Sequence, residues 1–169
     1  MRLWASAVAV AVMGAGSADA SAGTPAAQQG ASPPAVWRDL ARLNILCLAR
    51  SAGGVDAALQ ARLCEGARSS AAQGAPVPVR VIAAGDPAVL APDAATLLVH
   101  ASVEPAGRLL ALSVRPFRNS ADQTAVLFAA APRAVDLKAG DAALNRALDA
   151  AVAETLPWRA RPAGPRPIR

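Results

Sequence analysis

Histidine occurs once in this chain, in a pattern that raises the question of catalysis. His100 alternates with Ser102 and Glu104, so the three side chains are expected on one face of a strand. At about 3.3 Å per residue, His100 and Glu104 lie roughly 13 Å apart along that strand. A single histidine without neighbouring cysteines also does not build a usual zinc site. We therefore interpret His100 as a solvent-facing strand residue and predict neither a metal site nor a cofactor.

The carboxylates give no stronger indication of an active site. Asp86 and Asp93 are each next to a proline in sequence typical of turns. A pair of catalytic acids must lie within several ångströms of each other, which only the fold can arrange. The sequence contains no nucleophile-elbow, zinc-protease or phosphate-loop motif. We predict no enzymatic activity and no catalytic residue, and keep as an alternative an exported hydrolase whose site is assembled only in three dimensions.

The two cysteines predict a structural bond. Cys47 lies in segment 36–50, where apolar residues recur at helical spacing, and Cys64 lies in a second expected helix from Asp56 to about residue 72. A disulfide requires Cα atoms within about 7 Å, so the chain must fold back at Gly53-Gly54. Such a bond would stabilise the fold by about 3 kcal/mol. Two buried thiols that pack as small hydrophobes are the alternative.

The first twenty residues indicate export. Arg2 precedes an uninterrupted stretch of apolar or small residues, and Ala18 and Ala20 form an A-x-A cleavage site before Ser21. The stretch has about 13 apolar residues, whereas a membrane-spanning helix needs ~20. We predict a signal peptide over residues 1–20, a mature chain without a transmembrane span, and a periplasmic or secreted location. Export also removes the chain from nucleic acid.

Two further segments differ in composition from the rest. Residues 21–35 are small, polar and interrupted by proline, which predicts a flexible linker. Residues 157–169 are rich in proline and arginine and contain no acid, which predicts an extended basic tail. The tail is a candidate for weak binding to an anionic envelope surface, through Trp158, Arg159, Arg161, Arg166 and Arg169. A soluble terminus that binds nothing is the alternative.

Residues 36–156 are expected to form one domain. Alternating apolar residues predict strands at 77–81, 96–104, 108–118 and 124–131, joined by short turns, and the periodicity of 141–156 predicts a final helix. Arg115 should share a strand face with Ser113 and Phe117, close to Arg108, Arg118 and Arg133. We predict a two-layer α+β domain. Its antiparallel sheet of three to four strands is covered on one face by an N-terminal helical pair and a C-terminal helix.

The whole chain fits a small exported domain better than any other class. With 169 residues, 54% of them apolar, and a net charge of +5, it is neither a disordered chain nor two large domains. We expect a non-enzymatic binding or assembly module of the cell envelope that binds an envelope protein or an anionic surface. A soluble carrier of a small ligand is a further alternative, which a large apolar cavity between sheet and helices would mark.

Overall fold

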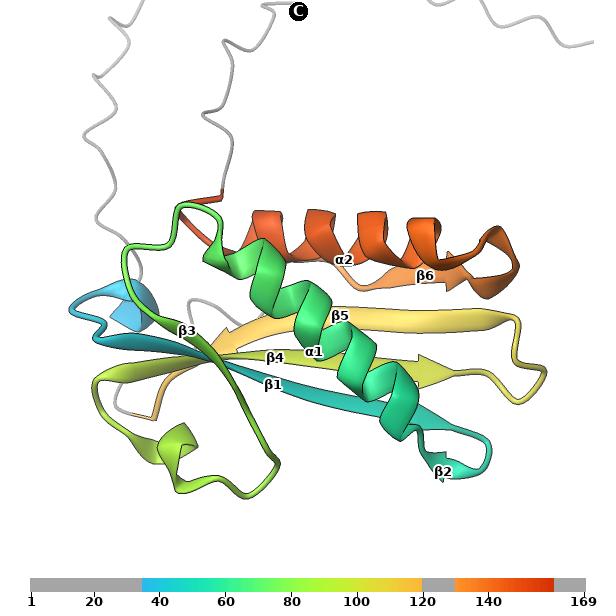
Figure 1. Ribbon diagram of the computed structural model, residues 1–169, viewed down its shortest axis with the longest axis horizontal. Helices are drawn as coiled ribbons and strands as arrows, with labels where there is room; N and C mark the ends of the chain where they lie inside the picture. Colours follow the sequence, from blue (N-terminus) through green and yellow to red (C-terminus); the bar gives the residue numbers. More distant parts are fainter. Residues whose placement is uncertain (1–34, 120–129, 160–169) are drawn as a thin grey trace, which may run out of the picture. The chain divides into compact units, whose positions relative to one another are not determined.

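The structure is a computed structural model that describes residues 35–119 and 130–159 (Figure 1). The predicted signal peptide with Ala18, Ala20 and Ser21, nearly all of the linker, and tail residues Arg161, Arg166 and Arg169 therefore lie outside the described residues. So does nearly all of the strand expected at 124–131.

Six strands and two α-helices make up the described part. Strands β1 (Arg42–Ser51), β4 (Ala94–Val103) and β5 (Leu109–Phe117) are long; β2 (Gly54–Val55), β3 (Val79–Ile82) and β6 (Arg133–Asp136) are short. The helices are α1 (Ala57–Ala72) and α2 (Asp141–Thr155). Three short 3-10 turns, η1 (Ala35–Trp37), η2 (Pro87–Leu90) and η4 (Leu137–Ala139), complete the order.

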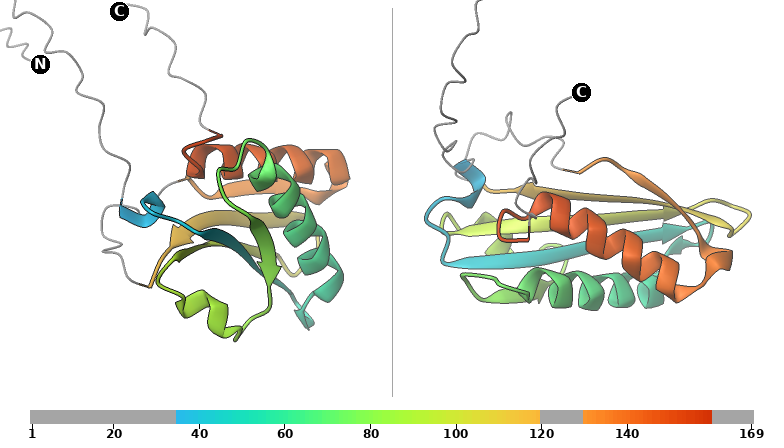
Figure 2. Two further views of the ribbon diagram at one scale, coloured as in Figure 1. Left: turned by 60° about the vertical axis from the view of Figure 1, so that its left-hand side comes forward. Right: turned by 90° about the horizontal axis from the view of Figure 1, so that it is seen from above.

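The strands form one mixed sheet in the order β2-β1-β4-β5-β6. β1 is parallel to β4, with Leu46 opposite Leu98, and on its other side it is parallel to β3. β4, β5 and β6 follow one another as antiparallel neighbours. Both helices lie on the same side of this sheet (Figure 2) and contact each other. The fold is thus mixed α+β, as predicted.

The predicted N-terminal helical pair is wrong, because residues 42–51 form the central strand β1. Leu43, Ile45, Cys47 and Ala49 are buried towards α1, while Leu46 and Leu48 lie on the opposite face and are half-buried. This strand carries leucines on both faces, the inner row buried by α1 and the outer row half-buried, so its sequence is apolar almost throughout. Such a run contains helical spacings as well as alternating ones, which explains the wrong prediction. The sheet is accordingly larger than predicted, and not purely antiparallel.

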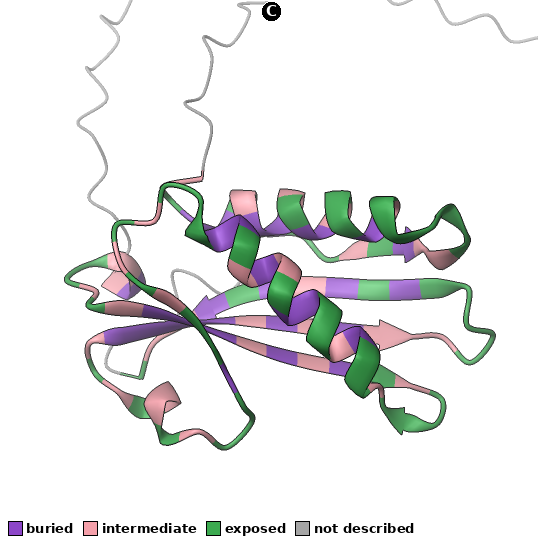
Figure 3. Cartoon of the chain, viewed as in Figure 1, coloured by how far each residue is buried: buried purple, intermediate pink, exposed green. Residues whose placement is uncertain are grey.

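The local signals at helix ends and hairpin turns are confirmed. Asp56 caps α1, its Oδ1 accepting a hydrogen bond from the backbone N–H of Leu59 at 2.9 Å. β4 and β5 form the predicted hairpin through the turn around Gly107. β5 alternates between buried and exposed residues along its length (Figure 3). β6, in contrast, was not expected from the sequence.

The hydrophobic core fills the space between the sheet and the helices. The largest fully buried side chains come from β1, α1, β4, β5 and α2. They are Leu43, Ile45, Leu63, Leu97, Val99, Leu110, Leu112, Val114, Leu148 and Val152, joined by Val36 of η1 and by Leu156, which follows α2.

The predicted disulfide is present and lies within this core. It joins Cys47 on β1 to Cys64 on α1, with their Cα atoms 5.6 Å apart. The bond therefore attaches a helix to the sheet, where a link between two helices was expected. Neither helix of the described residues is long and apolar enough to cross a bilayer.

Candidate functional site

The face of the sheet opposite α1 and α2, here called the open face, is where the structure gathers residues suited to binding. Its side chains form rows across the three long strands, because residues in register lie side by side. One row is Leu46, Leu98 and Arg115. The next is Leu48, His100 and Ser113.

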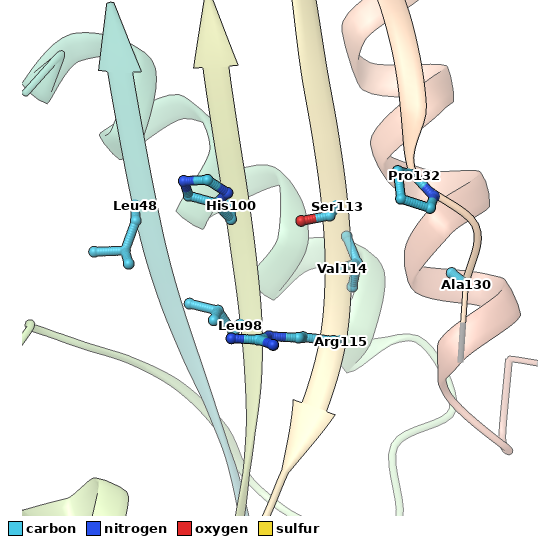
Figure 4. A pocket seen from close by; sticks show the side chains of 8 residues that line it. All are labelled: Leu48, Leu98, His100, Ser113, Val114, Arg115, Ala130 and Pro132. Carbon is cyan, nitrogen blue, oxygen red and sulfur yellow. The ribbon is translucent and has the colours of Figure 1, made fainter. Parts of the chain in front are cut away.

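The open face is hollowed at these rows. A depression of about 450 Å³ is lined by side chains from β1, β4 and β5, with Ala130 and Pro132 beyond β5. Figure 4 shows the side chains of Leu48, Leu98, His100 and Ser113 on one side of the strands, and that of Arg115 reaching across β4 beside Leu98. The floor of this depression is thus apolar, and polar groups stand at its centre and at one end.

A second depression adjoins the first along β5. Its volume is about 570 Å³, and Pro132 lines both. The second depression is mostly apolar, with Leu109, Ala111 and Ala134 among its lining residues. Ser102, Arg133 and, at the far end, Glu104 are its polar and charged lining residues. Together the two depressions follow β5 from Arg115 to Leu109.

One end of the open face is covered by the segment that contains η2. Asn44, fully buried on β1, donates from Nδ2 to the carbonyl of Ala88 at 3.0 Å, and its Oδ1 accepts from Arg80 Nε at 3.0 Å. Thr96, beside Asn44 on β4, is also buried there. Among the described residues, η2 covers only this end, so the rows of Leu98 and His100 remain accessible.

Arg115 and Arg50 are the two charges on the open face that no described residue balances; Arg50 lies opposite Ser102, two rows beyond Arg115, whereas Arg115 lines the first depression. The side chain of Arg115 is exposed, and no acid or carbonyl of the described chain pairs with it. The acids further along the face are engaged, since Glu104 Oε1 accepts from the backbone N–H of Leu109 at 2.9 Å and Asp136 lies 3.6 Å from Arg108. The depression at Arg115 is therefore electropositive.

The other arginines expected near Arg115 serve different contacts. Arg133 turns to the helix side and pairs with Glu154 on α2. Arg118 donates from Nε to the carbonyl of Pro92 at 2.8 Å, and from Nη1 to that of Arg38. The basic patch suggested by the sequence is thus dispersed, and Arg115 remains at the depression.

His100, Ser102 and Glu104 share a face, as predicted, but no acid lies beside the histidine in the register. The neighbours of His100 across the strands are Leu48 and Ser113. Asp93 precedes β4 by one residue, which places it on the order of 20 Å from His100. Asp86 caps η2, its Oδ1 accepting from the Ala88 N–H at 2.8 Å.

Asp93 is held in an ion pair at the covered end of the sheet. Arg42 donates to its Oδ2 at 2.6 Å, and this hydrogen bond holds the pKa of the Asp93 carboxyl below its ordinary value. The positive charge of Arg118 acts in the same direction. A carboxyl stabilised as the anion by arginine is suited to structure rather than to general acid catalysis.

The first residues of the predicted basic tail pack on the domain. Trp158 contacts Trp37 edge to face, with ring centroids 5.7 Å apart, and donates from Nε1 to the Ala71 carbonyl at 2.9 Å. Arg159 pairs with Asp149 at 2.6 Å and also donates to Gln73. These contacts compete with any binding of Trp158 and Arg159 to an anionic surface, which stays a prediction.

Sequence reasoning missed the contribution of β1 to the open face. Leu46 and Leu48 belong to the stripe opposite the buried residues of β1, a pattern of period two that would have identified them. Within residues 35–119 and 130–159, no group of three histidine, cysteine or acidic side chains is arranged to hold a metal ion.

Comparison with known proteins found no relative from which a function could be inferred. No family model matches the chain, and neither a curated protein nor a solved structure matches it. The geometry of the open face is therefore the basis for assigning a function.

Proposed function

We propose that the protein is a non-enzymatic binding module of the cell envelope, exported to the periplasm or secreted, and that it binds through the open face. The observation that carries this proposal is the accessible, hollowed face with an apolar floor and the unpaired Arg115. Exposed apolar surface next to a few polar groups is typical of binding sites. The Cys47–Cys64 disulfide supports the location, because such bonds persist in oxidising compartments.

The two alternatives have less support. An exported hydrolase needs acids that converge on a cleft, whereas Asp86 and Asp93 are engaged in a cap and an ion pair away from His100. A carrier that encloses its ligand needs a cavity between sheet and helices, where the described structure has closely packed leucine and valine side chains. Binding at the surface of the sheet fits the described residues better than either.

Localisation and processing test the first half of the proposal. We expect the chain isolated from cell fractions to begin at Ser21 and to contain no free thiol. Unprocessed chain in the cytoplasm, with Cys47 and Cys64 both reduced, would contradict the proposed export and the compartment together.

Site-specific photocrosslinking in the native envelope tests the second half. A crosslinking amino acid in place of Ser113 reports on the open face, and one in place of Asn145 reports on the exposed side of α2. We expect adducts from position 113 and few from position 145, with mass spectrometry identifying the adduct. Equal crosslinking from both positions would refute a specific role of this face.

The basic tail needs a separate test that leaves the domain intact. Because Trp158 and Arg159 pack on the domain, the tail is best removed from Arg161 onwards. If the tail binds anionic lipid, the shortened chain loses binding to vesicles containing phosphatidylglycerol, and binding by the full chain falls with salt. Equal binding by both chains at low salt would reject a role for the tail.

A further inference from the structure

We propose that the open face binds a single-chain anionic amphiphile, with the acid group at Arg115 and the alkyl chain running from the leucines of β1 and β4 along β5 to Leu109. This inference rests on the proposed binding function and names the class of ligand. Its basis is the juxtaposition of an unpaired guanidinium with an elongated apolar depression.

The head group would be held at the first depression. Arg115 is exposed, and a guanidinium pairs with a carboxylate through two parallel hydrogen bonds. Ser113 and His100 line the same depression one row further along, and both offer donors to a second oxygen. An anion is favoured here because, among the described residues, no acid balances Arg115.

The alkyl chain would lie over the apolar floor. Leu48 and Leu98 provide half-buried side chains next to Arg115, and the second depression continues along Ala111 to Leu109. Arg115 and Leu109 are six residues apart on β5, which corresponds to a track about 20 Å long. Its length matches an extended acyl chain, whose burial contributes roughly 25 cal/mol per Å².

The size of the site fits a small molecule as the occupant. The depressions measure about 450 and 570 Å³, within the range of small-molecule sites. An extended peptide would gain most from a free strand edge, whereas β4 below Leu98 is paired on both sides, with β1 and with β5.

Calorimetry on the chain as isolated from cells tests the proposal. The probes are dodecanoate, uncharged dodecanol as the chain without the charge, and acetate as the charge without the chain. We expect dodecanoate to bind at least tenfold more tightly than either. Arg115→Gln should weaken dodecanoate about tenfold, and Leu98→Ser should weaken dodecanoate and dodecanol alike.

Arg146→Gln is the matched control, because it removes the same charge from the exposed side of α2. It should leave dodecanoate binding unchanged. Equal binding of dodecanoate and dodecanol, or an Arg115→Gln variant that binds like the control, would overturn the proposal. Arg115 and Arg146 are exposed and Leu98 is half-buried, so circular dichroism should confirm that all three variants fold.

A glutamate-rich peptide serves as the competing ligand. If it binds in an Arg115-dependent manner while dodecanoate does not bind, the amphiphile is refuted but the open face keeps its binding role. Failure of the proposed function itself would be seen separately, as unprocessed cytoplasmic chain or as equal crosslinking from positions 113 and 145.

Discussion

Reduction of the Cys47–Cys64 disulfide is expected to lower the melting temperature of the protein by about 12 °C. The bond joins residues 17 apart in sequence, on a strand and on the helix packed against it. Both cysteines are buried, with exposed fractions of 1% and 8%, so that breaking the bond leaves two thiols in a packed environment. The folded contacts then change little, and the main effect falls on the unfolded chain.

The magnitude follows from the length of the closed loop. In the chain-entropy account, a loop of this length reduces the entropy of the unfolded state by about 10 cal/mol/K, which is roughly 3 kcal/mol at 25 °C. Unfolding gains about 2.1 cal/mol/K per residue, so a domain of about 125 residues gains roughly 0.26 kcal/mol/K. Dividing the first figure by the second gives a shift of about 12 °C.

Scanning calorimetry of three samples measures this shift. They are the oxidised protein, the same protein reduced in urea and refolded with reductant, and the Cys47→Ala/Cys64→Ala variant. Reduction must be carried out in urea because the buried bond is poorly accessible in the folded state. The reduced protein isolates the effect of the bond. The additional loss in the double variant reports the missing sulfur atoms, about 1 kcal/mol per site.

A difference below about 3 °C between the oxidised and the reduced protein would refute this reasoning, because the loop term alone predicts several times more. A thiol assay on the oxidised sample in urea is the control. Two reactive thiols in that sample would show that the bond is absent from the isolated chain.

Three further outcomes are expected from the packing and the ion pairs. Gly66→Ala should destabilise the protein by about 1 kcal/mol, because the new Cβ would lie 2.9 Å from Leu148 Cδ2. In a Leu148→Ala background the same change should stabilise α1 by up to about 1 kcal/mol. If urea titrations showed that the effects of the two substitutions simply add, they would contradict this contact. Asn44→Ala should cost about 2 kcal/mol, because it removes two hydrogen bonds from a fully buried position; an unchanged urea midpoint would refute that role. The ionised carboxyl of Asp93, whose pKa is lowered by Arg42, stabilises the fold at pH values above the ordinary carboxyl pKa, and this contribution is lost as the pH falls through the lowered pKa. Arg42→Gln should therefore make the loss of stability with falling pH less steep. Equally steep losses in the variant and the unmodified protein would contradict the pairing.

The elements that the sequence identified correctly carry their signals locally. α1 begins at an acidic cap and has a buried stripe at helical spacing, and α2 has a similar stripe. The β4–β5 hairpin shows alternation on both sides of a glycine turn. These patterns depend on neighbours within one or two turns of the chain, so they can be read without knowledge of the fold.

β1 could not be assigned in this way, because its surroundings come from distant segments. Its neighbours β3 and β4 begin more than thirty residues later in the chain, and their parallel pairing leaves no hairpin signal. Leucines on both faces of β1 satisfy a helical pattern as well as an extended one. The choice is made by the hydrogen bonds that β3 and β4 supply on either side.

The sequence by itself determined the composition of the domain, two of its helices, one hairpin and the presence of a pair of cysteines. Tertiary structure decided that Cys47 lies on a strand, that Asp86 and Asp93 are apart from His100, and that Leu48, Leu98 and Arg115 line one depression. The reason is physical: a side chain's type and its spacing from near neighbours are local properties. The rows across a sheet, in contrast, follow from strand order and register, which depend on contacts between remote segments.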